Sequence, residues 1–159
     1  MTALNRSLSG KLFIYHVDKD PPDRDINLLI KVTNRQIPGW ITVPGLSPSE
    51  ELLKQLEKWQ WDSKWPRMWP KYKKLYKHEL IKIPLKNLHL RHLLKRLNQG
   101  FDVAVACDCG DEQHCHKQII GEWINQQGIP VVQGKEIRKE RKKISPSNIE
   151  QLTLLEVEH

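Results

Sequence analysis

Hydrophobic and polar positions along the chain follow two kinds of pattern. Short apolar runs, rich in β-branched residues and bounded by turn residues, are typical of strands. They occur at residues 11–17, 26–33, 101–109 and 129–134. Apolar residues repeated every three or four positions are typical of amphipathic helices. They occur at residues 47–59, 70–80, 85–100 and 114–128.

The arrangement of these patterns predicts a fold class. The run 101–109 is apolar almost throughout, as expected for a strand buried on both faces of a parallel sheet. With the helix and strand that follow, it forms a βαβ unit of about 30 residues, whose two strands are parallel. We therefore predict a single α/β domain, with a mainly parallel sheet and helices on both faces. The domain is expected to cover residues 1–134, followed by a basic C-terminal tail, residues 135–159, that is partly helical.

Local signals place the ends of two helices. Ser47 is the expected N-cap of the first helix, because Pro48 suits the first helical position and Glu50 completes a capping box. Pro66 and Pro70 are expected to break the next segment, so that its helix begins at Pro70. Residues 34–46, which contain Arg35, are expected to form a long irregular loop of the kind that often carries function.

Two helical patterns allow more than one interpretation. An aromatic stripe at helical spacing can pack in the core or stack nucleotide bases, and we favour the core. The stripe consists of Trp69, Tyr72, Tyr76 and Leu80. His89 and His92, three positions apart on one helix, could bind a metal, but solvated histidines are the favoured interpretation.

Composition and charge narrow the function classes. The 159 residues carry a formal charge of +7 and three cysteines. Residues 54–96 hold thirteen Lys or Arg against three acids, and a second basic run covers 135–143. Such charge attracts nucleic acid or a phosphorylated small molecule, although lysines at helical spacing are more often a solvated face. No apolar run or leader suggests a membrane or secretion, and an odd cysteine count argues against a disulfide framework, so we expect a cytoplasmic protein.

The most informative stretch is the turn after the apolar run. Cys107, Cys109, Cys115 and His116 lie where a parallel strand would end, and His114–His116 open the next helix. Ligands of open α/β sheets bind at such ends, and a helix N-terminus favours anions and a cysteine thiolate. The turn can be a ligand-binding or reactive site, a structural zinc site, or for Cys107 simply a buried strand end.

Three segments together resemble a known family. They are "ACDCGDEQHCHKQIIGEWINQQGIPVV", "LSPSEELLKQL" and "WPKYKKLYKHEL". The family, catalogued as domain of unknown function 488 (DUF488), has a Cys-x-Glu turn followed by Cys-His-Arg at a helix start. The resemblance covers residues 12–132, about three quarters of the chain, and implies an α/β fold with a site at the Cys-His turn. It implies no substrate.

The resemblance also implies which residues of this chain occupy the signature positions of the family. They are Arg35, Ser49, Tyr76, Glu79, Cys107, Cys115 and His116. Two departures weaken the transfer. Cys109 stands where the family usually has glutamate, and Lys117 replaces an arginine, which keeps the charge but loses the bidentate fork.

The function predicted from these residues is binding of an anionic, nucleotide-like or nucleic-acid ligand at the Cys-His turn. Whether the protein acts on that ligand is left open. Cys115, His116 and Glu79 are the expected catalytic residues. The expected ligand-binding residues are Arg35, Ser49, Tyr76, Cys107, Cys109, His114 and Lys117. No metal or cofactor is assigned. The alternatives are a non-catalytic nucleic-acid or protein interaction module and a small zinc-stabilised domain.

Overall fold

A computed structural model describes residues 9–31, 37–61, 65–108 and 114–143 of the chain. It contains a sheet with strand order β3-β2-β4-β1-β5, in which every neighbouring pair is parallel. The strands are β1 (Leu12–His16), β2 (Ile26–Ile30), β3 (Ile41–Thr42), β4 (Val103–Cys107) and β5 (Val131–Gln133). The fold is therefore the single parallel α/β domain that the sequence predicts, with β4 at its centre.

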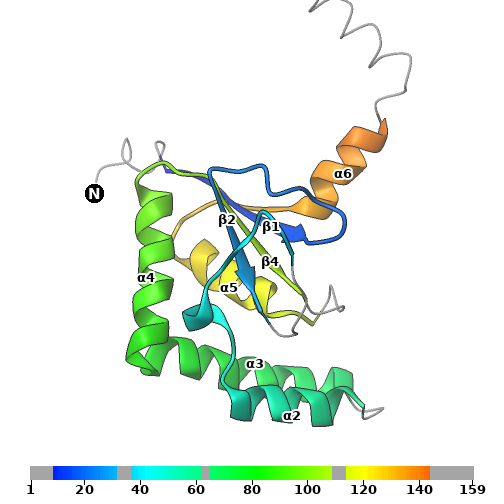
Figure 1. The fold of residues 1–159 in the computed structure, drawn as a ribbon, viewed down its shortest axis with the longest axis vertical. Coiled ribbons are helices and arrows are strands. Elements are labelled where there is room, and N and C mark those ends of the chain that lie inside the picture. Colours follow the sequence, from blue (N-terminus) through cyan, green and yellow to red (C-terminus); the bar gives the residue numbers. More distant parts are fainter. Residues whose placement is uncertain (1–8, 32–36, 62–64, 109–113, 144–159) are drawn as a thin grey trace, which may run out of the picture.

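The helices cover the sheet unequally. They are η1 (Pro44–Leu46), α2 (Glu50–Gln60), α3 (Trp65–Lys82), α4 (Pro84–Asn98), α5 (His116–Gln126) and α6 (Gly134–Lys143). Helices α4 and α5 pack on one face, and α3 with α2 lies beyond the carboxyl ends of the strands (Figure 1). On the other face α6 packs against β1, where Ile137 joins the apolar cluster and Arg138 pairs with buried Asp20. Residues 144–159 of the expected tail lie outside the described residues.

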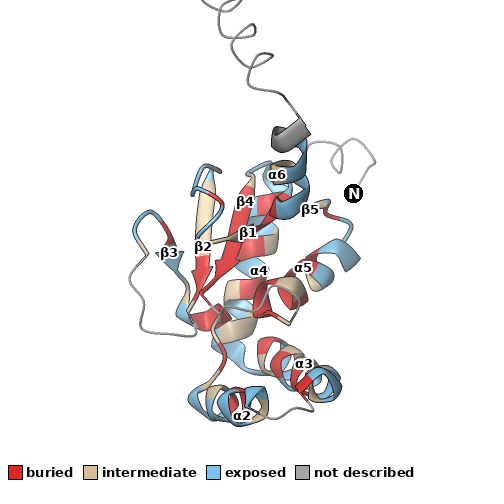
Figure 2. Ribbon diagram, turned by 90° about the vertical axis from the view of Figure 1, so that its right-hand side faces the viewer, coloured by how far each residue is buried: buried red, intermediate tan, exposed pale blue. Residues whose placement is uncertain are grey.

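The side chains of the central strand β4 point alternately to the two faces of the sheet, and all five of its residues are buried (Figure 2). Val103, Val105 and Cys107 face the helices and belong to the larger apolar cluster. Ala104 and Ala106 face the opposite side. Side chains alternate in this way along any strand, and the small alanines let large residues approach the sheet closely. Those large residues are Phe13, Tyr15, Leu29 and Trp40. The run 101–109 is thus a doubly buried strand, as predicted.

The cap of α2 differs from the prediction. Ser49, not Ser47, is the N-cap, and its Oγ accepts a hydrogen bond from the Leu52 amide at 3.2 Å. The Ser47 Oγ instead accepts from the Lys31 amide at 3.1 Å, which ties the segment to the end of β2. Both serines carry the local capping signal, and a tertiary contact that is invisible in the sequence decides between them.

The start of α3 was also predicted too late. The helix begins at Trp65 and contains Pro70 in its interior. Pro70 lacks the amide that would bond to the carbonyl four residues earlier, so only the first turn loses a hydrogen bond. Burial of the Trp65 ring holds that turn against the core. The aromatic stripe is core, as favoured, because Tyr72 and Tyr76 are fully buried and Leu80 nearly so.

Two helices are followed by a glycine. Gly100 follows α4 with φ 96° and Gly128 follows α5 with φ 88°. Both are in the left-handed region, which glycine enters without steric cost. Among the described residues, no helix combines the length and the apolar character that crossing a bilayer requires.

Candidate functional site

The candidate site lies at the carboxyl ends of β2 and β4, which face α3 (Figure 1). After β2 the chain continues to β3 at one edge of the sheet, and after β4 it continues through α5 to β5 at the other edge. In α/β proteins, ligands usually bind beside two adjacent parallel strands whose following connections run to opposite edges of the sheet. Cys107 ends β4, between His16 of β1 and Ile30 of β2.

Three potential metal or acid–base ligands meet at this end of β4. Cys107, Cys115 and His116 place one ligand atom each within 4.8 Å of one another. All three side chains are buried, with relative exposures of 2%, 0% and 1%. Burial of Cys107 was predicted. Cys115, the expected catalytic thiol, is buried as deeply, since it precedes α5 where the helix packs on the sheet.

The His116 ring is held from three sides. Its Nε2 lies 2.5 Å from the Tyr72 hydroxyl, and its Nδ1 lies 3.8 Å from the Cys107 Sγ. The Tyr76 ring packs edge-on against it, with centroids 4.8 Å apart. A neutral imidazole donates through one nitrogen and accepts through the other, so a Tyr72 hydroxyl that donates to Nε2 directs the Nδ1 proton at the thiol. The arrangement can therefore pass a proton between hydroxyl, imidazole and thiol.

Tyr76 connects this cluster to the segment before α2. Its hydroxyl donates to the Leu46 carbonyl at 2.5 Å, and the whole side chain is buried. Burial raises the pKa of that hydroxyl well above its ordinary value, and neighbouring groups that become negative when ionised raise it further. Those groups are Cys107, Tyr72, Cys115 and Glu79. Tyr76 therefore stays protonated and acts as a fixed hydrogen-bond donor.

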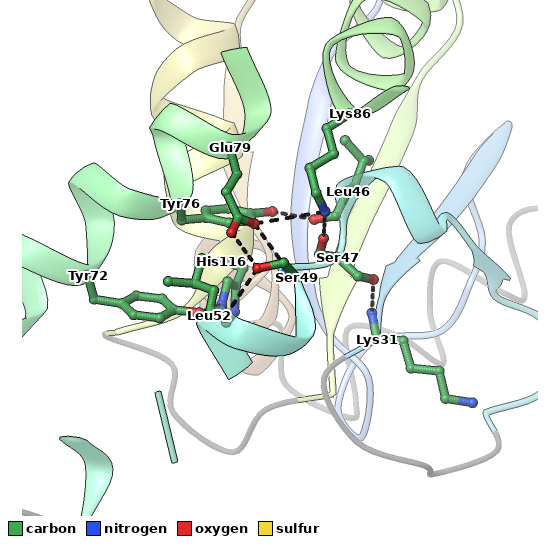
Figure 3. Close-up of polar contacts among 10 residues, drawn as sticks. All are labelled: Lys31, Leu46, Ser47, Ser49, Leu52, Tyr72, Tyr76, Glu79, Lys86 and His116. Carbon is green, nitrogen blue, oxygen red and sulfur yellow. Dashed lines mark hydrogen bonds and ion pairs between the residues drawn. The ribbon is translucent and has the colours of Figure 1, made fainter. Parts of the chain in front are cut away.

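Glu79 and Ser49 form a polar junction between α3 and α2 (Figure 3). The Ser49 Oγ donates to Glu79 Oε2 at 2.5 Å, and the Ser49 amide donates to Oε1 at 3.0 Å. Lys86 of α4 lies 4.0 Å from the same carboxylate and also donates to the Ser47 carbonyl. Burial lowers the pKa of Lys86, and the charge of Glu79 opposes that shift. Both carboxylate oxygens of Glu79 thus hold the start of α2.

Lys117 and His114 flank the cluster in different environments. Lys117 is 3% exposed, and its ammonium donates to the Tyr15 carbonyl at 2.9 Å. This bond fastens the first turn of α5 to β1. The His114 ring packs against Trp65 and Trp69 of α3, with centroid distances of 6.0 Å and 5.4 Å.

The structure brings together most of the residues that the sequence indicates. One connected region contains Ser49, Tyr76, Glu79, Cys107, Cys115 and His116. Arg35 and Cys109 lie outside the described residues. Two participants were missed as site residues, Tyr72 and Lys86. Tyr72 was assigned to the core alone, although its position four residues before Tyr76 places both hydroxyls on one helix face. Nothing in the sequence around Lys86 distinguishes it from the other lysines.

Fold and site define a parallel α/β protein with a buried Cys-His-Tyr cluster at the carboxyl end of its central strand. The chain matches the family DUF488-N3a, described as the "Active DUF488-N3 subclade", over residues 20–128. It therefore belongs to the DUF488 family, as the sequence motifs indicate. The matched segment contains both halves of the site, from Ser49 to His116. No curated protein and no solved structure matches the chain significantly.

Proposed function

We propose that the chain binds a phosphate-bearing, nucleotide-like ligand where β2 and β4 part, and that His116 carries a proton in a reaction on that ligand. The observation that carries the proposal is the pair of contacts that the His116 ring makes with the Tyr72 hydroxyl and the Cys107 sulfur at the carboxyl end of β4. A buried histidine between a hydroxyl and a thiol is a common arrangement for acid–base or thiol chemistry.

The surroundings support an anionic ligand. The cluster lies at the N-terminus of α5, an 11-residue helix whose free amides and dipole favour negative charge. The topological switch between β2 and β4 is the position at which open α/β sheets usually bind their ligands. The family description contains the word "Active", which we carry over as an expectation of catalysis. We assign the role of proton carrier to His116 rather than to Glu79, because both carboxylate oxygens of Glu79 accept hydrogen bonds from Ser49.

Calorimetric titration of the full chain with adenosine monophosphate, inorganic phosphate and a single-stranded oligonucleotide tests the proposal. We expect saturable binding of the nucleotide, competition by phosphate, and new products by chromatography after incubation. His116→Gln should abolish turnover while keeping the circular dichroism spectrum, and Lys95→Ala on α4 serves as the control. Binding of the oligonucleotide alone, weakening steeply with salt, would instead favour a non-catalytic interaction module. Binding of none of the three probes overturns the proposal.

A second candidate is a zinc-stabilised domain, favoured by the spacing of Cys107, Cys115 and His116. Tetrahedral Zn²⁺ with bonds of about 2.3 Å to sulfur and about 2.0 Å to nitrogen holds its ligand atoms roughly 3.5 to 3.8 Å apart. The 3.8 Å between Cys107 Sγ and His116 Nδ1 is close to that range, and the three ligand atoms all lie within 4.8 Å of one another, so the side chains would have to move closer together around the ion. Tyr72, on the other ring nitrogen, stands where metal-bound histidines usually have an orienting partner. Bound zinc would supply folding energy and a Lewis acid.

Elemental analysis of the purified chain separates this candidate from the first. Stoichiometric zinc, a melting temperature that falls on chelation, and loss of the metal in Cys115→Ser would establish the zinc-stabilised domain. Substitution by Co²⁺ adds a sulfur-to-metal absorption band that the same variant should remove. A metal content near zero, with a melting temperature indifferent to chelator, excludes the zinc-stabilised domain and leaves the first proposal standing.

A further inference from the structure

A cavity of about 310 Å³ lies between α4 and the edge of the sheet formed by β2 and β3. Its walls are apolar and come from both layers, and the main wall residues are Ile26, Leu28, Val43, Leu93 and Val103. It falls at the lower end of the volumes of small-molecule sites, which are typically apolar with a few polar groups. The family match and the proposed reaction at the Cys-His cluster assign nothing to it.

The cavity is separate from the Cys-His cluster, and one residue divides them. The Leu46 side chain lines the cavity, while the Leu46 carbonyl accepts the hydrogen bond from Tyr76. Next to it, a Cβ on Gly45 would lie 2.6 Å from the His89 ring, so the glycine lets that ring pack against the backbone. His89 is therefore fixed at the cavity wall. His89 is half-buried there, whereas His92 is exposed, as expected for a solvated helix histidine.

Apart from Thr42, the polar part of the lining comes from basic residues. His89, His92 and Arg96 of α4 all line the cavity. Residues Pro84–Asn98, the whole of α4, contain no aspartate or glutamate, so the positive charge of the helix is not neutralised within it. The Arg96 guanidinium contacts neutral groups, the Gln99 side-chain oxygen at 3.3 Å and the Phe101 ring at 6.0 Å. It is exposed, and a bound anion can reach it.

Two carboxylates stand near this end of the sheet, and both are engaged with the backbone. Asp25 accepts a hydrogen bond from the Asp102 amide at 2.8 Å, and Asp102 accepts one from the Lys11 amide at 2.9 Å. These bonds hold Lys11 and Asp102, the residues just before β1 and β4. Neither Asp25 nor Asp102 lines the cavity. Arg96 is therefore the permanently charged residue among those that line the cavity, and Lys95 and His92 lie beside it in an adjoining hollow.

We propose that this cavity binds a small amphiphilic anion, a monocarboxylate with an aliphatic body. At about 30 Å³ per water-sized atom, the cavity holds roughly ten heavy atoms. The apolar walls take the aliphatic chain, whose burial supplies most of the binding energy. The Arg96 guanidinium takes the carboxylate, for which its fork of donors is matched. A neutral chain of the same length lacks the second interaction, and a short carboxylate lacks the first.

Calorimetric titration of the full chain with octanoate, octan-1-ol and acetate tests these two requirements together. We expect saturable binding of octanoate, binding of octan-1-ol at least about fivefold weaker, and none of acetate at the same concentrations. Arg96→Ala should weaken octanoate binding about tenfold, as expected for loss of a charge-assisted hydrogen bond at a partly exposed site. Arg91→Ala, an exposed arginine of the same helix that does not line the cavity, is the matched control and should bind like the native chain.

Two further measurements locate the ligand. Leu28→Phe should block octanoate by filling the cavity, provided that its melting temperature stays near that of the native chain. If that variant unfolds, amide shift mapping of the native chain decides, with shifts expected in α4 and β2 and none in α5. Octanoate that binds Arg96→Ala and Arg91→Ala equally, that shifts α5 instead, or that fails to bind at millimolar concentration overturns the proposal. None of these outcomes depends on whether the Cys-His cluster binds a nucleotide.

Discussion

The Cys-His cluster and the cavity against α4 are built in opposite ways. At the carboxyl end of β4 the space is filled, with Tyr72, Tyr76 and His116 all buried and joined by hydrogen bonds and ring contacts. Against α4 the space is open, with apolar walls and a basic rim. Removing a member of a filled polar cluster lowers the free energy of unfolding, whereas the lining of a cavity can change at little cost. Stability measurements can therefore distinguish the two regions before any ligand is known.

The largest effect is expected for Tyr72→Ala. The Tyr72 ring is fully buried and contacts the rings of Trp59, Trp65, Trp69 and His116. Removing a buried aromatic ring costs about 3–5 kcal/mol through lost burial and the cavity that remains. Urea unfolding followed by tryptophan fluorescence measures the loss.

Tyr72→Phe separates the ring from the hydroxyl. It keeps the packing and removes only the partner of His116 Nε2, so we expect a smaller loss of about 1–3 kcal/mol, the cost of a buried polar group left without its bond. Equal losses for the two variants would mean that the hydroxyl carries the whole effect. A negligible loss in both would contradict the view of this region as a filled cluster.

The next effect concerns the two serines before α2. Ser49→Ala removes the helix cap and the hydrogen bond to Glu79, and we expect a loss of about 1–2 kcal/mol. Ser47→Ala removes only the bond to the Lys31 amide, at an expected cost of about 0.5–1 kcal/mol. The urea midpoints of both variants, measured side by side, give the comparison. A larger loss for Ser47→Ala would restore the cap that the sequence pattern favours.

These serines also show what the sequence can and cannot predict. The parallel sheet, the buried strand β4 and the core stripe on α3 follow from patterns that depend on burial alone, and the structure confirms them. The choice between Ser47 and Ser49 depends on a contact with Lys31, sixteen residues from Ser47 in sequence. The local signals favour Ser47, so only the folded chain shows that Ser49 is the cap.

The site, too, could be predicted from the sequence only in part. The Cys-His turn was found because cysteines and histidines stand out by residue type, and their convergence on one strand end follows from the parallel sheet. The role of Tyr72 depends on how α3 crosses the carboxyl ends of the strands, and the cavity depends on the distance between α4 and β2. Neither the crossing nor that distance has a counterpart in periodicity or composition.

A smaller, pH-dependent loss of stability is expected from Tyr15, which belongs to neither of the two regions. Its hydroxyl donates to Asp23 at 3.0 Å and accepts from Arg24 at 2.7 Å. Burial raises the pKa of Tyr15 above 10.0, with Asp23 adding to the shift and Arg24 opposing it. A raised pKa means that the folded state holds its proton longer than the unfolded state. The stabilisation is therefore complete below pH 10.0 and is lost as the pH rises through the folded pKa.

The measurement is the urea midpoint of the native chain and of Tyr15→Phe between pH 8 and pH 11. The native chain should lose stability above pH 10, and the variant should lose less over the same interval. Parallel curves would show that Tyr15 titrates alike in both states and would assign the alkaline loss to other groups, Tyr76 among them, whose pKa is also raised.

The smallest effect is expected for Arg96→Ala. The side chain is exposed, and its bond to Gln99 and contact with Phe101 are surface interactions worth little in water. We expect the free energy of unfolding to change by less than about 0.5 kcal/mol, as for most surface substitutions. Arg91→Ala, on the same helix, gives the baseline for losing one positive charge from α4. A loss above about 1 kcal/mol in Arg96→Ala alone would mean that the arginine supports the fold as the buried cluster does. Unchanged stability together with weakened octanoate binding would instead show that Arg96 serves to bind a ligand in the cavity, because packing gives no reason for an arginine there.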